Sequence, residues 1–217
     1  PAEILAQCGA ESKLLFLCSP NNPTGNLFER RRVEALLDRF PGMVVLDEAY
    51  IDYADEAGFL ALLDQFPKLI VLQTFSKARG LAGLRLGMAF AAPEIIQWLN
   101  RIKPPYNVNT QSQQIALDAL QNQDRLPPIA YWQNEQKRLA KGLAKLDLVQ
   151  AIYPSDANFL LVRFEDPDSI YKELVQQSII VRNRSRLPRC EGCLRITVGT
   201  ATENDQLLQM LQKLDKA

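Results

Sequence analysis

Six polar residues lie at or near the ends of short apolar runs, and their side chains suit nucleophilic and acid–base chemistry. A lysine amine can attack a carbonyl carbon or carry a proton, an aspartate can pair with a cation, and an arginine fork can bind an oxyanion. Each residue alone has an ordinary structural explanation, since a strand-end aspartate often caps a helix and a lysine after a strand is usually solvated. The six candidates are Asn22, Asp47, Tyr50, Ser76, Lys77 and Arg85.

The alternation of apolar runs with helical spacing predicts the elements that position these residues. Nearly continuous apolar runs are typical of strands covered on both faces, and strand–helix alternation predicts a parallel sheet built from right-handed crossovers. Ligands of such sheets bind beyond the carboxyl ends of the strands, so we expect the candidate side chains to converge there. Strands are expected at 14–18, 43–46, 69–73 and 86–91, and helices at 33–40 and 59–66.

The rest of the chain is typical of a small α+β unit, so the expected fold class is α/β with a mostly parallel sheet and a smaller second domain. Thr202, with Asp205 three residues later, predicts a capping box at the start of the last helix. We place the domain boundary near Ala140, which gives predicted domains at 1–140 and 141–217. Helices are expected at 111–120, 128–146, 169–177 and from Thr202 onward, and strands at 158–164, 179–182 and 193–198.

Composition excludes several classes of protein. The 217 residues carry 25 basic and 25 acidic side chains, so no basic excess is available to bind a nucleic-acid backbone. No apolar run is long enough to cross a bilayer, and no secretory signal opens the chain, so we expect a cytoplasmic protein. The chain has no histidine, which excludes Ser-His-Asp chemistry, and we expect no metal site at the CxxC formed by Cys190 and Cys193.

Four short motifs carry the candidate residues: SPNNPTG at 19–25, DEAY at 47–50, SK at 76–77 and LAGLRLG at 81–87. In this order and at these separations they resemble the fold-type I aminotransferases, which depend on pyridoxal 5'-phosphate. Lys77 lies 30 residues after Asp47, and Arg85 lies 8 residues after Lys77. The resemblance extends over nearly the whole chain, because PSDANF and LRITVG in the second region also fit the family's pattern.

The resemblance implies a role for each candidate residue. Lys77 would hold the cofactor as a Schiff base and then move a proton at the substrate Cα. Asp47 would pair with the pyridine nitrogen and keep it protonated. Ser76 and Arg85 would bind the cofactor phosphate, with the arginine acting as a planar fork.

Two more residues would contact the cofactor ring if the resemblance holds. Tyr50 and Asn22 would hydrogen-bond its phenolic oxygen, although Tyr53 is a competing candidate for the tyrosine. The resemblance also implies a homodimer, and it begins partway into the family's pattern, so an N-terminal portion is expected to be missing. Relatives bind the cofactor phosphate partly through that portion, so we expect the isolated 217-residue chain to be weakly active or inactive.

The strings VLDEAYIDY, SKARGLAGLRLG and GCLRITVGT resemble the histidinol-phosphate aminotransferases in particular. This resemblance implies transfer of an amino group between L-histidinol phosphate and glutamate or 2-oxoglutarate. One site would then bind a phosphate and a carboxylate in turn, which suits an arginine, and Arg195 is the first candidate and Arg182 the second. Two alternatives stay open: a threonine-phosphate decarboxylase on the same scaffold, and an inactive scaffold that acts as a binding module.

Overall fold

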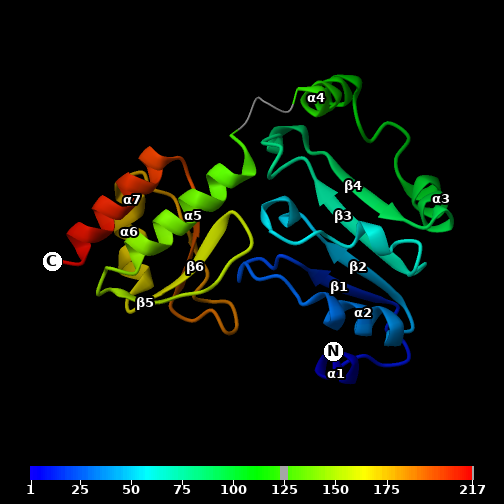
Figure 1. Ribbon diagram of the computed structural model, residues 1–217, viewed down its shortest axis with the longest axis horizontal. Helices are drawn as coiled ribbons and strands as arrows, with labels where there is room; N and C mark the ends of the chain where they lie inside the picture. The colour runs from blue at the N-terminus through cyan, green and yellow to red at the C-terminus, as the bar shows by residue number, and fades with distance from the viewer. Residues whose placement is uncertain (123–126, 217) are drawn as a thin grey trace. The chain divides into compact units, whose positions relative to one another are not determined.

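The structure, a computed structural model, divides into two compact units (Figure 1). It describes residues 1–122 and 127–216. The first unit comprises Pro1–Pro20 and the described part of Leu27–Leu126, and the second comprises Asn21–Asn26 and the described part of Pro127–Ala217.

Helix α5 (Ile129–Leu143) belongs wholly to the second unit. Its residues Leu139 and Leu143 are fully buried in that unit's apolar core, which fixes the helix there. The sequence analysis placed the domain boundary near Ala140, which lies inside this helix. The part of α5 before this position therefore packs with the smaller unit in this structure.

The first unit is built on a four-stranded sheet in the order β1-β2-β3-β4. The first three strands are parallel, whereas β4 runs antiparallel to β3. The carboxyl ends of the parallel strands therefore lie at the same edge as the start of β4, where Gly87 pairs with Thr74. The strands are β1 (Leu14–Cys18), β2 (Met43–Asp47), β3 (Leu69–Thr74) and β4 (Gly87–Ala91).

Alternation along β2 separates a core face from a site face, because successive side chains of a strand point to opposite sides. Val44 and Leu46 belong to the buried cluster that the apolar side of helix α2 (Arg30–Arg39) covers. Asp47 follows Leu46 directly, so its carboxylate projects from the other face. The unit also contains α1 (Ala2–Ala6), α3 (Pro93–Ile102) and α4 (Thr110–Gln121).

Three elements of the first unit differ from the sequence analysis. The helix predicted at 59–66 is wrong, because only a 3-10 turn, Leu60–Leu62, forms there. The backbone N–H of Phe59 instead donates to the Glu48 carboxylate (2.6 Å), so the start of this segment is held by a hydrogen bond to a residue outside it. Helices α1 and α3 were not predicted; on α3, Trp98 and Ile102 are exposed, whereas Ile95, Ile96 and Leu99 are half-buried.

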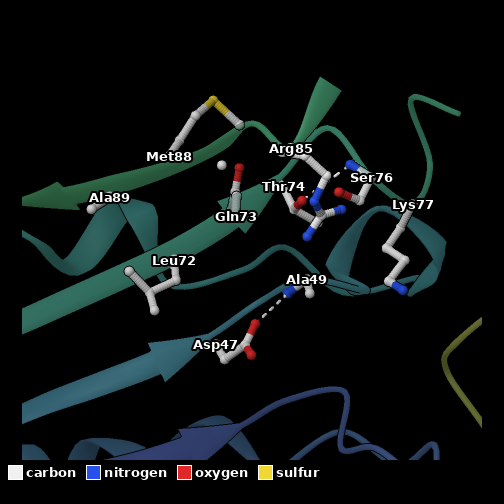
Figure 2. A pocket seen from close by; sticks show the side chains of 11 residues that line it. Asp47, Ala49, Leu72, Gln73, Thr74, Ser76, Lys77, Arg85, Met88 and Ala89 are labelled. Carbon is white, nitrogen blue, oxygen red and sulfur yellow. Dashed lines mark hydrogen bonds between the residues drawn. The ribbon is translucent and has the colours of Figure 1, made fainter. Parts of the chain in front are cut away.

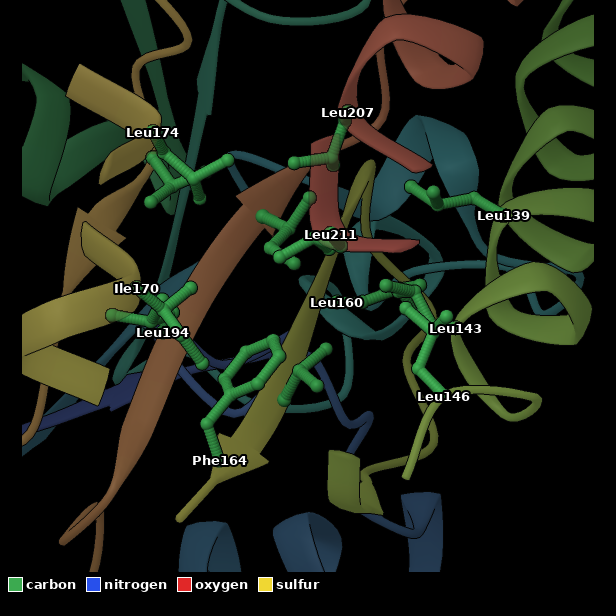
Figure 3. Close-up of a cluster of buried hydrophobic side chains, with 13 residues drawn as sticks. Leu139, Leu143, Leu146, Leu160, Phe164, Ile170, Leu174, Leu194, Leu207 and Leu211 are labelled. Atoms are coloured by element: carbon green, nitrogen blue, oxygen red, sulfur yellow. The ribbon is translucent and has the colours of Figure 1, made fainter. Parts of the chain in front are cut away.

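The second unit packs three helices on one face of an antiparallel sheet with the order β5-β6-β8-β7 (Figures 1 and 3). Leucines from all three helices meet Leu160 and Leu194 of the sheet in this core. Strand β5 was not predicted, and the strand predicted at 179–182 is wrong except for its last residue. The elements are α5, α6 (Pro167–Gln176), α7 (Ala201–Leu214), β5 (Val149–Ile152), β6 (Phe159–Phe164), β7 (Arg182–Asn183) and β8 (Cys193–Thr197).

The capping box of α7 is shifted by two residues from its predicted place. Thr200 is the N-cap and accepts a hydrogen bond from the Glu203 backbone N–H, while the Glu203 carboxylate accepts one from the Thr200 N–H (2.7 Å). The predicted pair of Thr202 and Asp205 is wrong, because Asp205 instead forms an ion pair with Arg138 of α5. None of the helices in the described part of the chain is long and apolar enough to span a bilayer.

Candidate active site

A pocket of about 560 Å³ opens at the carboxyl ends of β2 and β3 (Figure 2). This volume falls within the range of small-molecule and cofactor sites. The pocket brings together Asp47, Ser76, Lys77 and Arg85, so four of the predicted site residues lie in one place. The other lining residues are Ala49, Leu72, Gln73, Thr74, Gly87, Met88 and Ala89.

Asp47 is held at the end of β2 by its own loop. Its Oδ1 accepts a hydrogen bond from the Ala49 backbone N–H (3.0 Å), which fixes the carboxylate over the turn that follows the strand. The neighbouring side chain, Leu46, is fully buried in the core below the sheet. A carboxylate held in this way can pair with a cationic group in the pocket.

Lys77 lies beside the ring of Tyr50. The Nζ atom is 5.1 Å from the ring centroid, within the range of a cation–π contact. Tyr50 is buried and precedes the 3-10 turn Ile51–Tyr53, so the turn fixes the position of the ring. This contact supports Tyr50 over Tyr53, which is also buried, as the tyrosine beside the lysine.

A tight loop returns Arg85 to the end of β3, where Figure 2 shows it beside Thr74 and Ser76. The Ser76 N–H donates to Thr74 Oγ1 (3.0 Å), and an Arg85 Nη1 donates to the Ala82 carbonyl (2.9 Å). Arg85 itself has φ of 54°, a left-handed conformation that is uncommon for an arginine. Such strain is typical of functional sites.

The remaining predicted residues lie in the second unit. Asn22 Oδ1 accepts a hydrogen bond from Arg195 Nη1 (2.7 Å), and Arg182 is the register partner of Arg195 across β7 and β8. Gly25 shapes the loop that carries Asn22, because its φ is 84° and a side chain there would collide with Ser155. The convergence of Asn22 with Asp47 and Lys77 stays a prediction.

Comparison with known proteins assigns the family. The family model described as aminotransferase class I and II matches residues 2–211. The chain belongs to this family. Among curated relatives, histidinol-phosphate aminotransferases of Cytophaga hutchinsonii and Parabacteroides distasonis are 52% and 49% identical over 210 and 212 residues. These matches cover 96% and 97% of the chain but only 60% and 61% of the relatives, so the chain spans about three fifths of their length.

Solved structures of aminotransferases have the same fold. The histidinol-phosphate aminotransferase of Clostridium acetobutylicum superposes with a TM-score of 0.90 at 20% identity, covering 99% of this chain and 67% of that one. That of Sinorhizobium meliloti, in complex with pyridoxal-5'-phosphate, gives 0.85 at 27% identity, covering 99% and 60%. L-threonine-O-3-phosphate decarboxylase from Porphyromonas gingivalis also gives 0.85, at 25% identity, covering 98% and 68%. The predicted aminotransferase fold is therefore confirmed.

Sequence reasoning missed one residue that helps to position this pocket. Glu48 is 1% exposed, and its carboxylate accepts hydrogen bonds from the Phe59 N–H (2.6 Å) and from Gln73 Nε2 (3.0 Å). Burial raises the pKa of Glu48. The sequence contained a sign of this burial: Glu48 lies two residues after apolar Leu46, so it continues the core face just beyond the end of β2.

The Glu48 bonds tie the loop that carries Tyr50 to the strand that leads to Lys77. Arg30 supports the same loop from outside, donating to the carbonyls of Ala57 (3.1 Å) and Gly58 (3.0 Å). Among the residues that the structure describes, no group of three or more acidic, cysteine or histidine side chains is placed to hold a metal ion.

Proposed function

We propose that this chain is part of a pyridoxal-phosphate-dependent aminotransferase that transfers an amino group between L-histidinol phosphate and 2-oxoglutarate. The names of its curated relatives support histidinol phosphate as one substrate, since the matches reach 52% identity over nearly the whole chain. Because the chain spans only about 60% of those relatives, the activity is proposed for the protein that contains the whole sequence.

One observation carries the proposal: the Lys77 amine and the Asp47 carboxylate line the same pocket. A cofactor with an aldehyde, a ring nitrogen and a phosphate needs an amine, an acid and an anion-binding group. The pocket supplies these as Lys77, Asp47, and Ser76 with Arg85, so the residues present fit the group. When bound, pyridoxal phosphate supplies an electron sink for the charge left at the substrate Cα.

The chain's own residues then have separate tasks. Lys77 would hold the cofactor through its aldehyde group, and its Nζ, as a free amine beside the substrate, would carry a proton to and from the substrate Cα. Asp47 pairs with the ring nitrogen and holds its proton in place. Ser76 and Arg85 bind the phosphate, and Arg85 can do so through two parallel N–H bonds.

The substrate and the ring oxygen are contacted by further residues in this proposal. Tyr50 and Asn22 hydrogen-bond the phenolic oxygen of the cofactor. Arg195 and Arg182 bind the phosphate of histidinol phosphate in one half-reaction and a carboxylate of 2-oxoglutarate in the other, because an arginine fork matches both oxyanions. We propose that the protein is cytoplasmic. We also propose that it is a homodimer, and sedimentation of the purified protein would test this oligomeric state.

Covalent mapping tests the assignment of Lys77. The protein is loaded with pyridoxal phosphate, reduced with borohydride and digested, and the modified peptide is sequenced by mass spectrometry. We expect the label on Lys77 and none at this peptide in Lys77→Arg. A label on another lysine, or none at all in the wild type, would contradict the proposed cofactor site.

A coupled assay tests the substrates. Histidinol phosphate and 2-oxoglutarate should yield glutamate, while threonine phosphate should release no CO₂. Release of CO₂ from threonine phosphate without formation of glutamate would support the decarboxylase alternative. The structural match to L-threonine-O-3-phosphate decarboxylase is the reason to test it. A protein that takes up cofactor but acts on neither substrate would refute the proposed substrate pair.

A further inference from the structure

The small unit's sheet has one face covered by helices and one face turned away from them. Leu160 and Val162 of β6 and Leu194 of β8 belong to the core that α5, α6 and α7 cover (Figure 3). Because strand side chains alternate, Arg163 of β6 and Arg195 of β8 project from the other face. That face therefore carries guanidinium groups from neighbouring strands.

Strand β7 adds to this basic face. The Asn183 side chain donates to Asp168 Oδ1 of α6 (2.6 Å), so Asn183 points toward the helices. Its neighbours Arg182 and Arg184 therefore point to the opposite side. The Arg184 N–H donates to the Cys193 carbonyl (2.9 Å), which continues the pairing of this segment with β8 beyond the end of β7.

The register places these arginines in two adjacent rows. Arg182 is paired with Arg195, and Arg184 lies beside Cys193, which is itself paired with Arg163. Paired residues in an antiparallel sheet have Cβ atoms about 5 Å apart, and residues two apart along a strand are separated by about 7 Å. Arginine side chains are long enough to reach a common ligand across these spacings.

Little negative charge balances this face. Within the described ranges, no salt bridge is formed by Arg163, Arg182 or Arg184, and β5 to β8 contain no acidic residue. Two acidic side chains lie near these strands in sequence, Glu165 and Glu191; both are exposed, and Glu191 interacts with the charge of Arg163. The face is therefore electropositive and suited to an anion.

Arg184 and Arg163 differ in how their guanidinium groups are used. Arg163 hydrogen-bonds the Cys193 sulfur, which raises the pKa of Arg163, and it lies over the Tyr153 ring at 5.8 Å. The Nε atoms of Arg163 and Arg184 are both buried without a hydrogen-bond partner, but Arg163 also contacts Cys193 and Tyr153. Buried polar groups in native proteins are nearly always satisfied, so Arg184, next to Arg182 on the same face, is a candidate for contact with a ligand.

We propose that Arg184 joins Arg182 and Arg195 as a binding residue for a dianionic phosphate monoester. A carboxylate presents two oxygens in one plane and is satisfied by one arginine fork, whereas a phosphate presents three terminal oxygens and about two charges. A third guanidinium therefore favours phosphate over carboxylate. This inference rests on the proposed function for the identity of the substrate, but phosphate binding itself needs no cofactor.

Titration with inorganic phosphate, followed by isothermal calorimetry, tests the proposal on the full chain. Arg184→Gln should weaken phosphate binding by about tenfold or more, the factor that follows from losing a hydrogen bond between charged groups. Arg186→Gln is the matched control, because it removes the same charge from an exposed position two residues away, and it should change the affinity by less than about twofold. Arg184→Lys, which keeps the charge and loses the fork, should fall between them.

Acetate titrated against the same variants tests the preference between anions. We expect the affinity for acetate to change little in Arg184→Gln. Equal losses of phosphate affinity in Arg184→Gln and Arg186→Gln, or no measurable phosphate binding by the wild type, would overturn the proposal. If the Lys77 mapping or the amino-transfer assay fails but phosphate affinity still depends on Arg184, the proposed function is refuted and this inference is not.

Discussion

Replacing Glu48 by alanine should destabilise the first unit, because two buried hydrogen bonds converge on this carboxylate. Each hydrogen bond to a charged group contributes about 1.5–3 kcal/mol, and removing the acceptor leaves the Phe59 N–H and the Gln73 amide unsatisfied. Releasing the carboxylate from its buried position offsets part of this loss, since burial raises the pKa of Glu48. We therefore expect Glu48→Ala to lower the free energy of unfolding by about 2–4 kcal/mol.

Glu48→Gln separates the hydrogen bonds from the charge. The glutamine carbonyl can still accept from the Phe59 N–H, and the Gln73 amide can turn to present its oxygen, so the loss should be below about 1.5 kcal/mol. Urea denaturation of both variants, followed by circular dichroism, measures the two losses. The reasoning is refuted if Glu48→Ala lies within about 0.5 kcal/mol of the wild type.

The raised pKa of Glu48 also predicts how the free energy of unfolding changes with pH. The pKa of Glu48 is raised from 4.5 in the folded chain, so ionisation is less favourable there than in the unfolded chain. The stability that the protonated carboxyl contributes is complete below pH 4.5 and is lost as the pH rises through the folded-state pKa. Glu48→Gln cannot ionise, so its stability should fall less than that of the wild type over this rise.

Four other substitutions test particular contacts. Leu143→Ala removes a fully buried side chain from the second core and should cost about 2–5 kcal/mol in urea denaturation, whereas a loss under about 1 kcal/mol would contradict the packing. Thr200→Ala should lower stability by about 1 kcal/mol and Thr202→Ala by much less, and the reverse order would restore the predicted capping box. Arg85→Gln should weaken pyridoxal phosphate binding by about tenfold or more in a fluorescence titration, and an unchanged affinity would exclude Arg85 as a phosphate ligand.

The parts of the fold that the sequence predicted well are those with local signals. The runs at 14–18 and 43–46 are uninterrupted apolar segments, the run at 69–73 is apolar up to Gln73, and each forms a strand within one residue of its predicted ends. Asp47 and Lys77 share a pocket because the carboxyl ends of parallel strands share an edge. No tertiary information was needed for that step.

The parts that it missed depend on contacts between distant residues. Glu48 bonds to Phe59 and Gln73, which lie 11 and 25 residues away, and the first of these bonds competes with the helix predicted at 59–66. Arg195 bonds to Asn22 across 173 residues, a pairing that no local pattern contains. In the last helix, two Thr–x–x–acid patterns overlap, and the structure uses Thr200 with Glu203, which is the pair that matches the usual capping box with Glu or Gln at its third position.

The backbone of Arg85 sets stability against function at one position. A residue with φ of 54° is strained unless it is glycine or asparagine, so Arg85→Gly should relieve about 1 kcal/mol of backbone energy. The same substitution removes the proposed phosphate ligand. Libraries of this protein selected for heat resistance would accumulate glycine or asparagine at position 85, and libraries selected for turnover would keep the arginine. The difference between the unfolding free energies of the arginine and glycine variants would measure the strain that the proposed phosphate contact must offset.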